Sequence, residues 1–260
     1  MEPAFVESFV YGTVAIFGLI WGSYLNVVVY RLPQGLSTAV PASHCPRCRS
    51  RIWPVDNIPV LSWLLLAARC RSCGGAISVR YPLVEVSGAT VFVLGLRRFD
   101  DPFEMATGWL VACVLLALAL IDYDRRLVPL VLTLPLGVLA WVLQPFLGWA
   151  SPLDAVATSC LGSVVFLALS RAWGWWSQSP GDGGLGLGDA YVMFLIGGFF
   201  GLQSTLRIVL LALLGAVAVL FLSRSASWIL RRSGRFEEPL ARLPLVTFLS
   251  GAALWVLLFV

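Results

Sequence analysis

Charged residues are scarce in this 260-residue chain: they make up 12% of it, whereas hydrophobic residues make up 59%. Soluble domains carry about twice that share of charge, so the composition excludes an ordinary soluble globular protein. Lysine is absent, and all 18 basic residues are arginine. His44 is the only histidine, which nearly excludes a nucleophilic centre that needs a histidine base.

Long hydrophobic runs are abundant. A transmembrane helix needs roughly 17–25 mostly apolar residues. Eight runs approach or exceed this length, at residues 4–30, 81–96, 104–121, 129–148, 153–170, 190–206, 207–222 and 242–260. The first run is too long for a cleaved signal peptide, and no basic residue precedes it. We therefore predict an all-α polytopic membrane protein with about eight transmembrane helices in contact with lipid.

The arginines indicate the orientation of the chain. If the N-terminus lies outside, fifteen of the 18 arginines fall in cytoplasmic segments. This bias is the positive-inside pattern of membrane proteins. It accounts for the formal net charge of +4 through topology and lipid contact, so we expect no nucleic-acid partner.

One long polar segment, residues 31–80, interrupts the hydrophobic runs. It contains two Cys-x-x-Cys pairs with the spacing of a four-thiolate zinc site: Cys45, Cys48, Cys70 and Cys73. Two disulfides are the alternative, but the predicted cytoplasmic location is reducing and disfavours them. The predicted organisation is a first transmembrane helix (1–30), a cytoplasmic domain with structural zinc (31–80) and a membrane domain (81–260).

Two carboxylates lie at ends of hydrophobic runs that are predicted to face the cytoplasm. Asp122 closes the third run, and Asp189 opens the sixth. Acids at membrane depth are costly and suggest function, and two that share a proton can activate water and protonate a leaving amine. Taken singly, Asp122 could pair with nearby arginines and Asp189 could cap a helix. Glu85, just inside the second run, is the rival partner or a polar strut between helices.

These residues resemble the type IV prepilin peptidase family, which are membrane aspartic proteases of the Gly-x-Gly-Asp kind. Gly186-Leu187-Gly188-Asp189 is similar to the second aspartate motif of the family. In the first motif the aspartate precedes a proline by seven residues, as Asp122 precedes Pro129. The similarity extends to three further segments, at residues 22–33, 41–66 and 70–85.

The resemblance implies an aspartic endopeptidase of the bacterial inner membrane. Such proteins remove the leader peptide of type IV prepilins or pseudopilins at the cytoplasmic face, and many then methylate the new N-terminus with S-adenosylmethionine. Asp122 and Asp189 are the expected catalytic pair, with no metal needed in the reaction. Substrate contacts are expected from Gly186, Gly188 and Glu85, and Gly183 and Gly184 would also let a peptide backbone approach Asp189.

The chain departs from the family pattern at four places. Leu130 replaces a usual Asp or Asn, Tyr191 replaces a Lys, and residues 244–247 read PLVT in place of Pro-Phe-Gly-Pro. Ala67-Ala68 replaces Arg-Gly, which predicts weak or absent methyl transfer. Two other functions stay open: a zinc-ribbon membrane adaptor with an inactive dyad, and an ion-coupled transporter, whose acids would lie nearer mid-membrane.

Overall fold

The computed structural model describes residues 3–177, 186–231 and 244–260. Over these ranges the chain forms helices and loops, with two isolated β-bridges (His44 to Arg51 and Arg69 to Ala76) and no strand. The helices are α1 (Pro3–Arg31), η1 (Leu32–Gln34), η2 (Pro54–Asn57), α2 (Leu61–Leu65), α3 (Arg80–Arg98), α4 (Pro102–Arg125), α5 (Leu130–Leu147), α6 (Pro152–Ser177), α7 (Leu187–Arg231) and α8 (Leu245–Phe259). The predicted all-α class is therefore confirmed for the described part of the chain.

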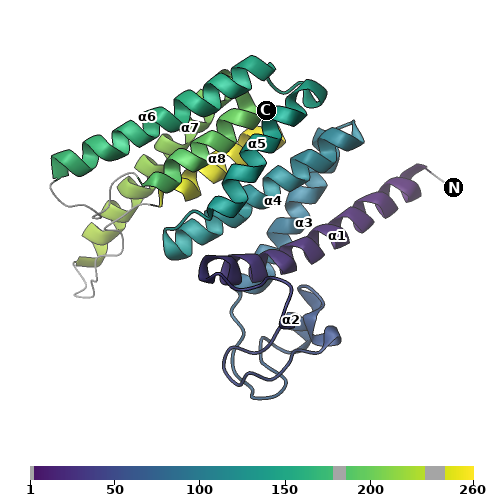
Figure 1. Ribbon diagram of the computed structural model, residues 1–260. Coiled ribbons are helices and arrows are strands. Elements are labelled where there is room, and N and C mark those ends of the chain that lie inside the picture. The colour runs from purple at the N-terminus through teal and green to yellow at the C-terminus, as the bar shows by residue number, and fades with distance from the viewer. Residues whose placement is uncertain (1–2, 178–185, 232–243) are drawn as a thin grey trace. The chain divides into compact units, whose positions relative to one another are not determined.

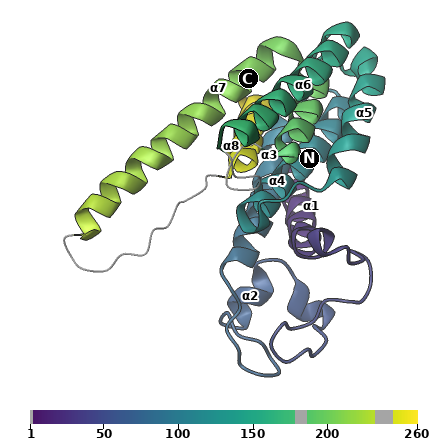
Figure 2. The ribbon, with the colours of Figure 1, turned by 60° about the vertical axis from the view of Figure 1, so that its left-hand side comes forward.

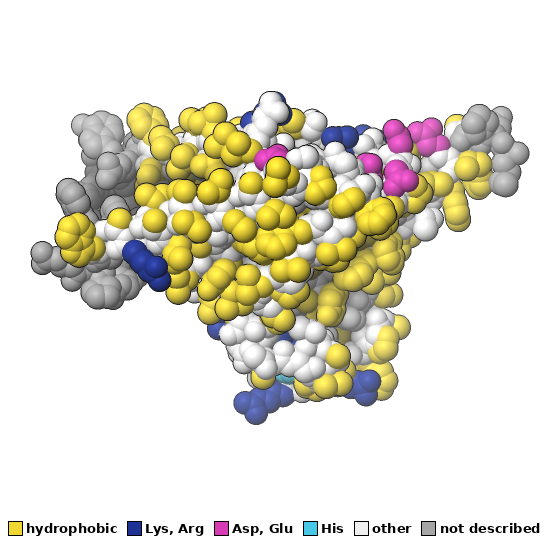
Figure 3. Space-filling view, turned by 45° about the horizontal axis from the view of Figure 1, so that its top comes forward, with side chains coloured by type: hydrophobic (Ala, Val, Ile, Leu, Met, Phe, Trp, Pro, Cys, Tyr) yellow, Lys and Arg dark blue, Asp and Glu magenta, His cyan; other side chains and the backbone are white. Residues whose placement is uncertain are grey.

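Five of these helices, α1, α4, α5, α6 and α7, are long and apolar enough to cross a membrane. The apolar helix α8 is shorter, at 15 residues. Helix α3 covers the expected run 81–96 but is not among the five, because it carries Arg80, Glu85, Arg97 and Arg98 within 19 residues. Hydrophobic side chains cover much of the helical surface in Figure 3. The protein is accordingly a multi-pass membrane protein.

The expected runs 190–206 and 207–222 both lie in α7, which is interrupted at Gly201. Gly201 has φ 64° and ψ −179°, a conformation that is open to glycine and strained for other residues. The helix therefore has two arms, and the long arm after the break is visible in Figure 2. The boundary between the two runs lies at this glycine and not at position 206, where hydropathy placed it.

Side chains from two other helices satisfy the backbone groups at this break. Gln144 of α5 is buried and donates through Nε2 to the carbonyls of Gly198 and Phe199, both at 2.8 Å. Asp154 of α6 accepts the N–H of Leu202 at 3.2 Å. Broken helices are tolerated at membrane depth only where such partners replace the lost helical bonds. The break is thus held by hydrogen bonds on both sides.

Residue contacts divide the chain into two units, residues 1–113 and 114–260, with the division inside α4. In the first unit α1 and α3 lie side by side (Figure 1). Glycines allow this: a Cβ added to Gly22 would lie 2.6 Å from the Cα of Glu85, and one added to Gly88 would lie 2.5 Å from the Gly18 carbonyl oxygen. Small residues four apart are typical of closely packed membrane helices.

The second unit contains the end of α4 together with α5, α6, α7 and α8. Helix α7 packs against α5, α6 and α8 (Figures 1 and 2). The largest fully buried side chains of this unit include Phe199, Leu195, Ile196, Ile208 and Leu249. This core fixes the beginnings of α7 and α8, and both of these carry residues of the candidate site.

Candidate functional site

The four predicted cysteine ligands come together in the loop between α1 and α3. Their sulfur atoms all lie within 4.8 Å of one another, and the Sγ atoms of Cys45 and Cys73 are 4.0 Å apart. Four thiolates at such separations suit a tetrahedral zinc ion, whose Zn–S bonds are about 2.3 Å long. The structure therefore provides a four-cysteine cluster compatible with a zinc site.

The two Cys-x-x-Cys turns share one backbone pattern. In the first, Cys45 N–H donates to the Ser50 carbonyl at 2.9 Å and Arg49 N–H donates to the Cys45 carbonyl at 2.9 Å. The second repeats these bonds at 2.8 Å, with Gly75 and Gly74 in the corresponding positions around Cys70. Both turns need a residue with positive φ, which is Arg49 (60°) in the first and Gly74 (67°) in the second. Glycine at position 74 allows this conformation without strain.

Two of the thiols are held in surroundings that favour the thiolate. The side-chain hydrogen bond with Ser50, at 3.0 Å, is the main cause that lowers the pKa of Cys48 to about 6. Backbone N–H groups of Cys73 and Ser72 lower the pKa of Cys70. Thiolates and not thiols bind metal. The local hydrogen bonds therefore prepare these residues as ligands.

A salt bridge fastens the segment before α2 to the second cysteine turn. Arg71 donates to Asp56 Oδ1 at 2.6 Å through Nη2 and to Oδ2 at 2.8 Å through Nε. The Arg71 guanidinium lowers the pKa of Asp56. Because Arg71 lies between two of the cysteines in sequence, this pair links η2 to the cluster.

Glu85 anchors the same loop to α3. It is buried, and its Oε2 accepts the backbone N–H of Val60 at 2.7 Å. Val60 has φ 61°, which is strained for a β-branched residue and needs such a contact to hold it. This bond gives Glu85 a structural role within the first unit, and its expected contact with substrate stays a prediction.

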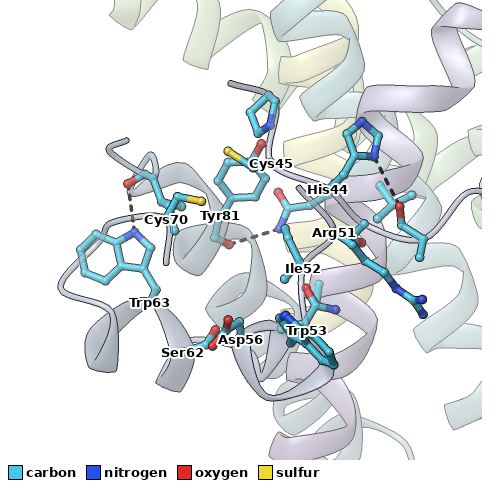
Figure 4. Close-up of a pocket in the computed structure, with 18 of the residues that line it drawn as sticks. His44, Cys45, Arg51, Ile52, Trp53, Asp56, Ser62, Trp63, Cys70 and Tyr81 are labelled. Carbon is cyan, nitrogen blue, oxygen red and sulfur yellow. Dashed lines mark hydrogen bonds between the residues drawn. The ribbon is translucent and has the colours of Figure 1, made fainter. Parts of the chain in front are cut away.

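An open cavity of about 1150 Å³ lies beside the cysteine cluster in the first unit. Figure 4 shows the rings of Trp53, Trp63 and Tyr81 and the guanidinium of Arg51 among the side chains that line it. Trp63 is fixed by donating through Nε1 to the Ile77 carbonyl at 3.1 Å. The cavity therefore offers aromatic faces and positive charge to a ligand.

Asp122 lies near the C-terminal end of α4 and is buried, with 6% of its surface exposed. Its Oδ2 accepts the backbone N–H of Thr247 at 2.8 Å and lies 3.1 Å from the hydroxyl of the same residue. The neighbouring Asp124 is exposed. Burial thus distinguishes Asp122, the aspartate that precedes Pro129 by seven residues, from Asp124.

Asp189 is the third residue of α7 and is also buried, at 8% exposed. The Gly186 N–H donates to Asp189 Oδ2 at 2.7 Å, so the carboxylate reaches back to the residue before the helix, as in a capping box. Gly188 packs against the loop after α4: a Cβ there would lie 2.6 Å from Val128 Cγ2. Gly183 and Gly184 lie outside the described residues.

Asp122 and Asp189 belong to the same unit, and the charge of Asp122 acts on the Asp189 carboxylate. Both carboxylates are buried, and two carboxylates that interact closely can hold one shared proton. Thr247 was not anticipated from sequence. The sequence marks this position only by the departure of residues 244–247 from the family pattern.

The chain is similar to known proteins over most of its length. Residues 16–99 match the Bacterial Peptidase A24 N-terminal domain, and residues 109–222 match the Type IV leader peptidase family. A protein of Myxococcus xanthus called prepilin leader peptidase/N-methyltransferase is 36% identical over 248 residues, which cover 92% of this chain and 73% of that protein. A protein of the same name from Pseudomonas putida is 34% identical over 86% of this chain and 83% of its own length. No solved structure matches the chain. The chain therefore belongs to the type IV leader peptidase family.

Proposed function

We propose that this protein is a membrane-embedded aspartic endopeptidase that removes the leader peptide of type IV prepilins or pseudopilins, with Asp122 and Asp189 as its catalytic dyad. The observation that carries the proposal is that these two carboxylates are both buried in the same unit and that the charge of one acts on the other. The names of the relatives, prepilin leader peptidase/N-methyltransferase, support the substrate class.

The reaction follows from two carboxyl groups that share one proton. The ionised aspartate takes a proton from a water molecule, and the oxygen of this water attacks the scissile carbonyl carbon. The protonated aspartate donates a hydrogen bond to the carbonyl oxygen. When the C–N bond breaks, the proton passes to the leaving amine. Gly186, which is exposed, lies beside Asp189 where an extended peptide can approach.

The location of the dyad supports cleavage at the membrane surface. Asp122 lies three residues before the end of α4, and Asp189 lies at the third residue of α7. A transporter would more naturally place its acids near mid-membrane, so these positions favour the peptidase. The arginine bias supports a cytoplasmic location for this surface.

Zinc has a structural role in this proposal. Cys45, Cys48, Cys70 and Cys73 would hold the ion, which would cross-link the two cysteine turns and contribute folding energy to the loop. No step of the hydrolysis involves the metal.

We also propose that the first unit binds S-adenosylmethionine as a methyl donor for the new N-terminus. Trp53 and Trp63 offer rings for an adenine, and Arg51 offers a partner for a carboxylate. Ala67 and Ala68 have φ of 47° and 57°, so the backbone at Ala68 follows the path that the usual glycine would favour. This conformation weakens the reason to expect loss of methyl transfer.

The peptidase proposal is tested by incubating the purified protein with a prepilin and measuring the mass of the product. We expect loss of a mass equal to that of the leader, and an intact prepilin would contradict the proposal. For the methyl donor, calorimetric titration with S-adenosylhomocysteine should show binding that weakens in Trp53→Ala. It should be unchanged in Trp255→Ala, which alters an exposed ring on α8.

A further inference from the structure

Thr247 contacts the Asp122 side chain through both its backbone and its hydroxyl group. Its backbone N–H donates to Asp122 Oδ2 at 2.8 Å, and its Oγ1 lies 3.1 Å from the same oxygen. The Oγ1 atom also lies 3.0 Å from the Ala119 carbonyl oxygen, one turn earlier in α4. One residue of α8 is therefore fastened to the end of α4 at three points.

The backbone contact follows from the position of Thr247 in the first turn of α8. The first N–H groups of a helix have no partner inside it and favour a negative charge nearby. Pro244 precedes this helix and offers no side-chain cap. The Asp122 carboxylate takes this role, since it accepts the N–H of Thr247 and also interacts with that of Val246.

The hydroxyl contact allows for both protonation states of Asp122. A hydroxyl group has one hydrogen to donate, yet two acceptor oxygens lie in range, on Asp122 and Ala119. When Asp122 is ionised, the Thr247 hydroxyl donates to its carboxylate. When Asp122 carries a proton on Oδ2, the carboxyl O–H donates to Thr247 Oγ1, and the threonine hydrogen turns to the Ala119 carbonyl.

We propose that Thr247 is a positioning residue for the dyad. It holds the Asp122 carboxyl group in the same position in both the ionised and the protonated state. This inference rests on the proposed function, because it assumes that Asp122 changes protonation during cleavage. A rotating hydroxyl suits such a residue, since it can both donate and accept. A buried polar group without a hydrogen-bond partner destabilises the protein. In both protonation states of Asp122, the hydrogen bond between its carboxyl group and the Thr247 hydroxyl is kept.

The test compares Thr247→Val, Thr247→Ser and the wild type in prepilin cleavage. Valine keeps the shape and the backbone N–H but removes the hydroxyl, and serine restores it. We expect Thr247→Val to lower kcat by about tenfold or more, because it removes a hydrogen bond to a charged group. The KM should stay within about twofold of wild type, since the change does not touch the bound substrate. Thr247→Ser should retain kcat within about threefold of wild type, on the same reasoning. Thr107→Val is the matched control, because Thr107 is a buried threonine of α4 whose hydroxyl donates to the Phe103 carbonyl.

Equal kcat in the wild type and Thr247→Val would overturn the inference. So would a Thr247→Ser variant as slow as Thr247→Val, provided that both variants retain zinc and remain monodisperse in detergent. In either case the wild type still cleaves, and the proposed function stands. Absence of cleavage by the wild type would overturn the proposed function itself, and the role of Thr247 with it. These two failures are therefore distinguished in one experiment.

Discussion

Gly186 and Asp189 bond to each other twice at the start of α7. The Gly186 N–H donates to Asp189 Oδ2 at 2.7 Å, and the Asp189 N–H donates to the Gly186 carbonyl at 3.2 Å. The carboxylate thus closes a small ring with the residue that precedes the helix. This ring fixes Asp189 to the backbone and gives the Gly-x-Gly-Asp motif a structural role beside its proposed catalytic one.

Gly188→Ala should impair cleavage more than Gly186→Ala does. A Cβ on Gly188 would lie 2.6 Å from Val128 Cγ2, whereas one on Gly186 would have Asp189 Oδ2 as its nearest neighbour at 3.8 Å. Overpacking of this kind costs about 1–3 kcal/mol and displaces the surrounding backbone. Adding Val128→Ala to Gly188→Ala should restore part of the activity. Rates of leader removal for the four proteins check this, and a double variant no better than Gly188→Ala would refute the steric explanation.

Cys48→Ser should abolish stoichiometric zinc binding and loosen the loop between α1 and α3. The four sulfurs lie within 4.8 Å of one another, and a hydroxyl is a poor substitute for a thiolate ligand. Cys160→Ser, on an exposed position of α6, is the control and should keep the metal. Elemental analysis of the purified proteins measures this, and a wild type without zinc would exclude the metal site.

Ala68→Gly should stabilise the cysteine loop by about 1 kcal/mol. Ala68 has φ 57°, where an L-residue is strained and glycine is not. Ala76→Gly is the control, since Ala76 does not have positive φ and glycine there only adds entropy to the unfolded chain. Zinc release to a chelator should slow in Ala68→Gly and not in Ala76→Gly, and faster release in Ala68→Gly would contradict the backbone argument.

Gly201→Ala should destabilise the second unit, by more than about 2 kcal/mol. The alanine would have to adopt φ 64°, and its Cβ would collide with the Asp154 carboxylate. Gly251→Ala in α8 is the control, because a Cβ there meets nothing within 4 Å. Thermal unfolding in detergent compares them, and equal midpoints would show that the break at Gly201 is not required.

Sequence alone could predict the parts of the site that depend on short-range spacing. The cysteine cluster follows from two Cys-x-x-Cys pairs, and the preference for Asp122 over Asp124 comes from the resemblance, because the aspartate of the family's first motif precedes a proline by seven residues. These predictions need only residues that lie near one another in the chain or share one metal.

Long-range contacts could not be predicted in this way. The bond between Thr247 and Asp122 joins residues 125 positions apart, and that between Gln144 and Phe199 joins residues 55 apart. Hydropathy likewise could not place the break in α7, because Gly201 lies in an apolar stretch and its conformation depends on partners from α5 and α6. Glu85 shows the same limit, since its partner Val60 lies in a different segment.

The most direct test of the proposed catalytic dyad replaces each of its aspartates by the amide of the same shape. Asp122→Asn and Asp189→Asn should each reduce leader cleavage by at least about a hundredfold, because an amide can neither carry the activating charge nor share the proton. The double variant should be little worse than either single one, since the two act as a unit. Membrane insertion and zinc content should be unchanged, and the exposed Asp124→Asn should remain active. With either dyad variant, the mass of the prepilin should remain that of the uncleaved protein. Cleavage by Asp189→Asn at a rate near that of the wild type would contradict the aspartic mechanism and favour a membrane adaptor.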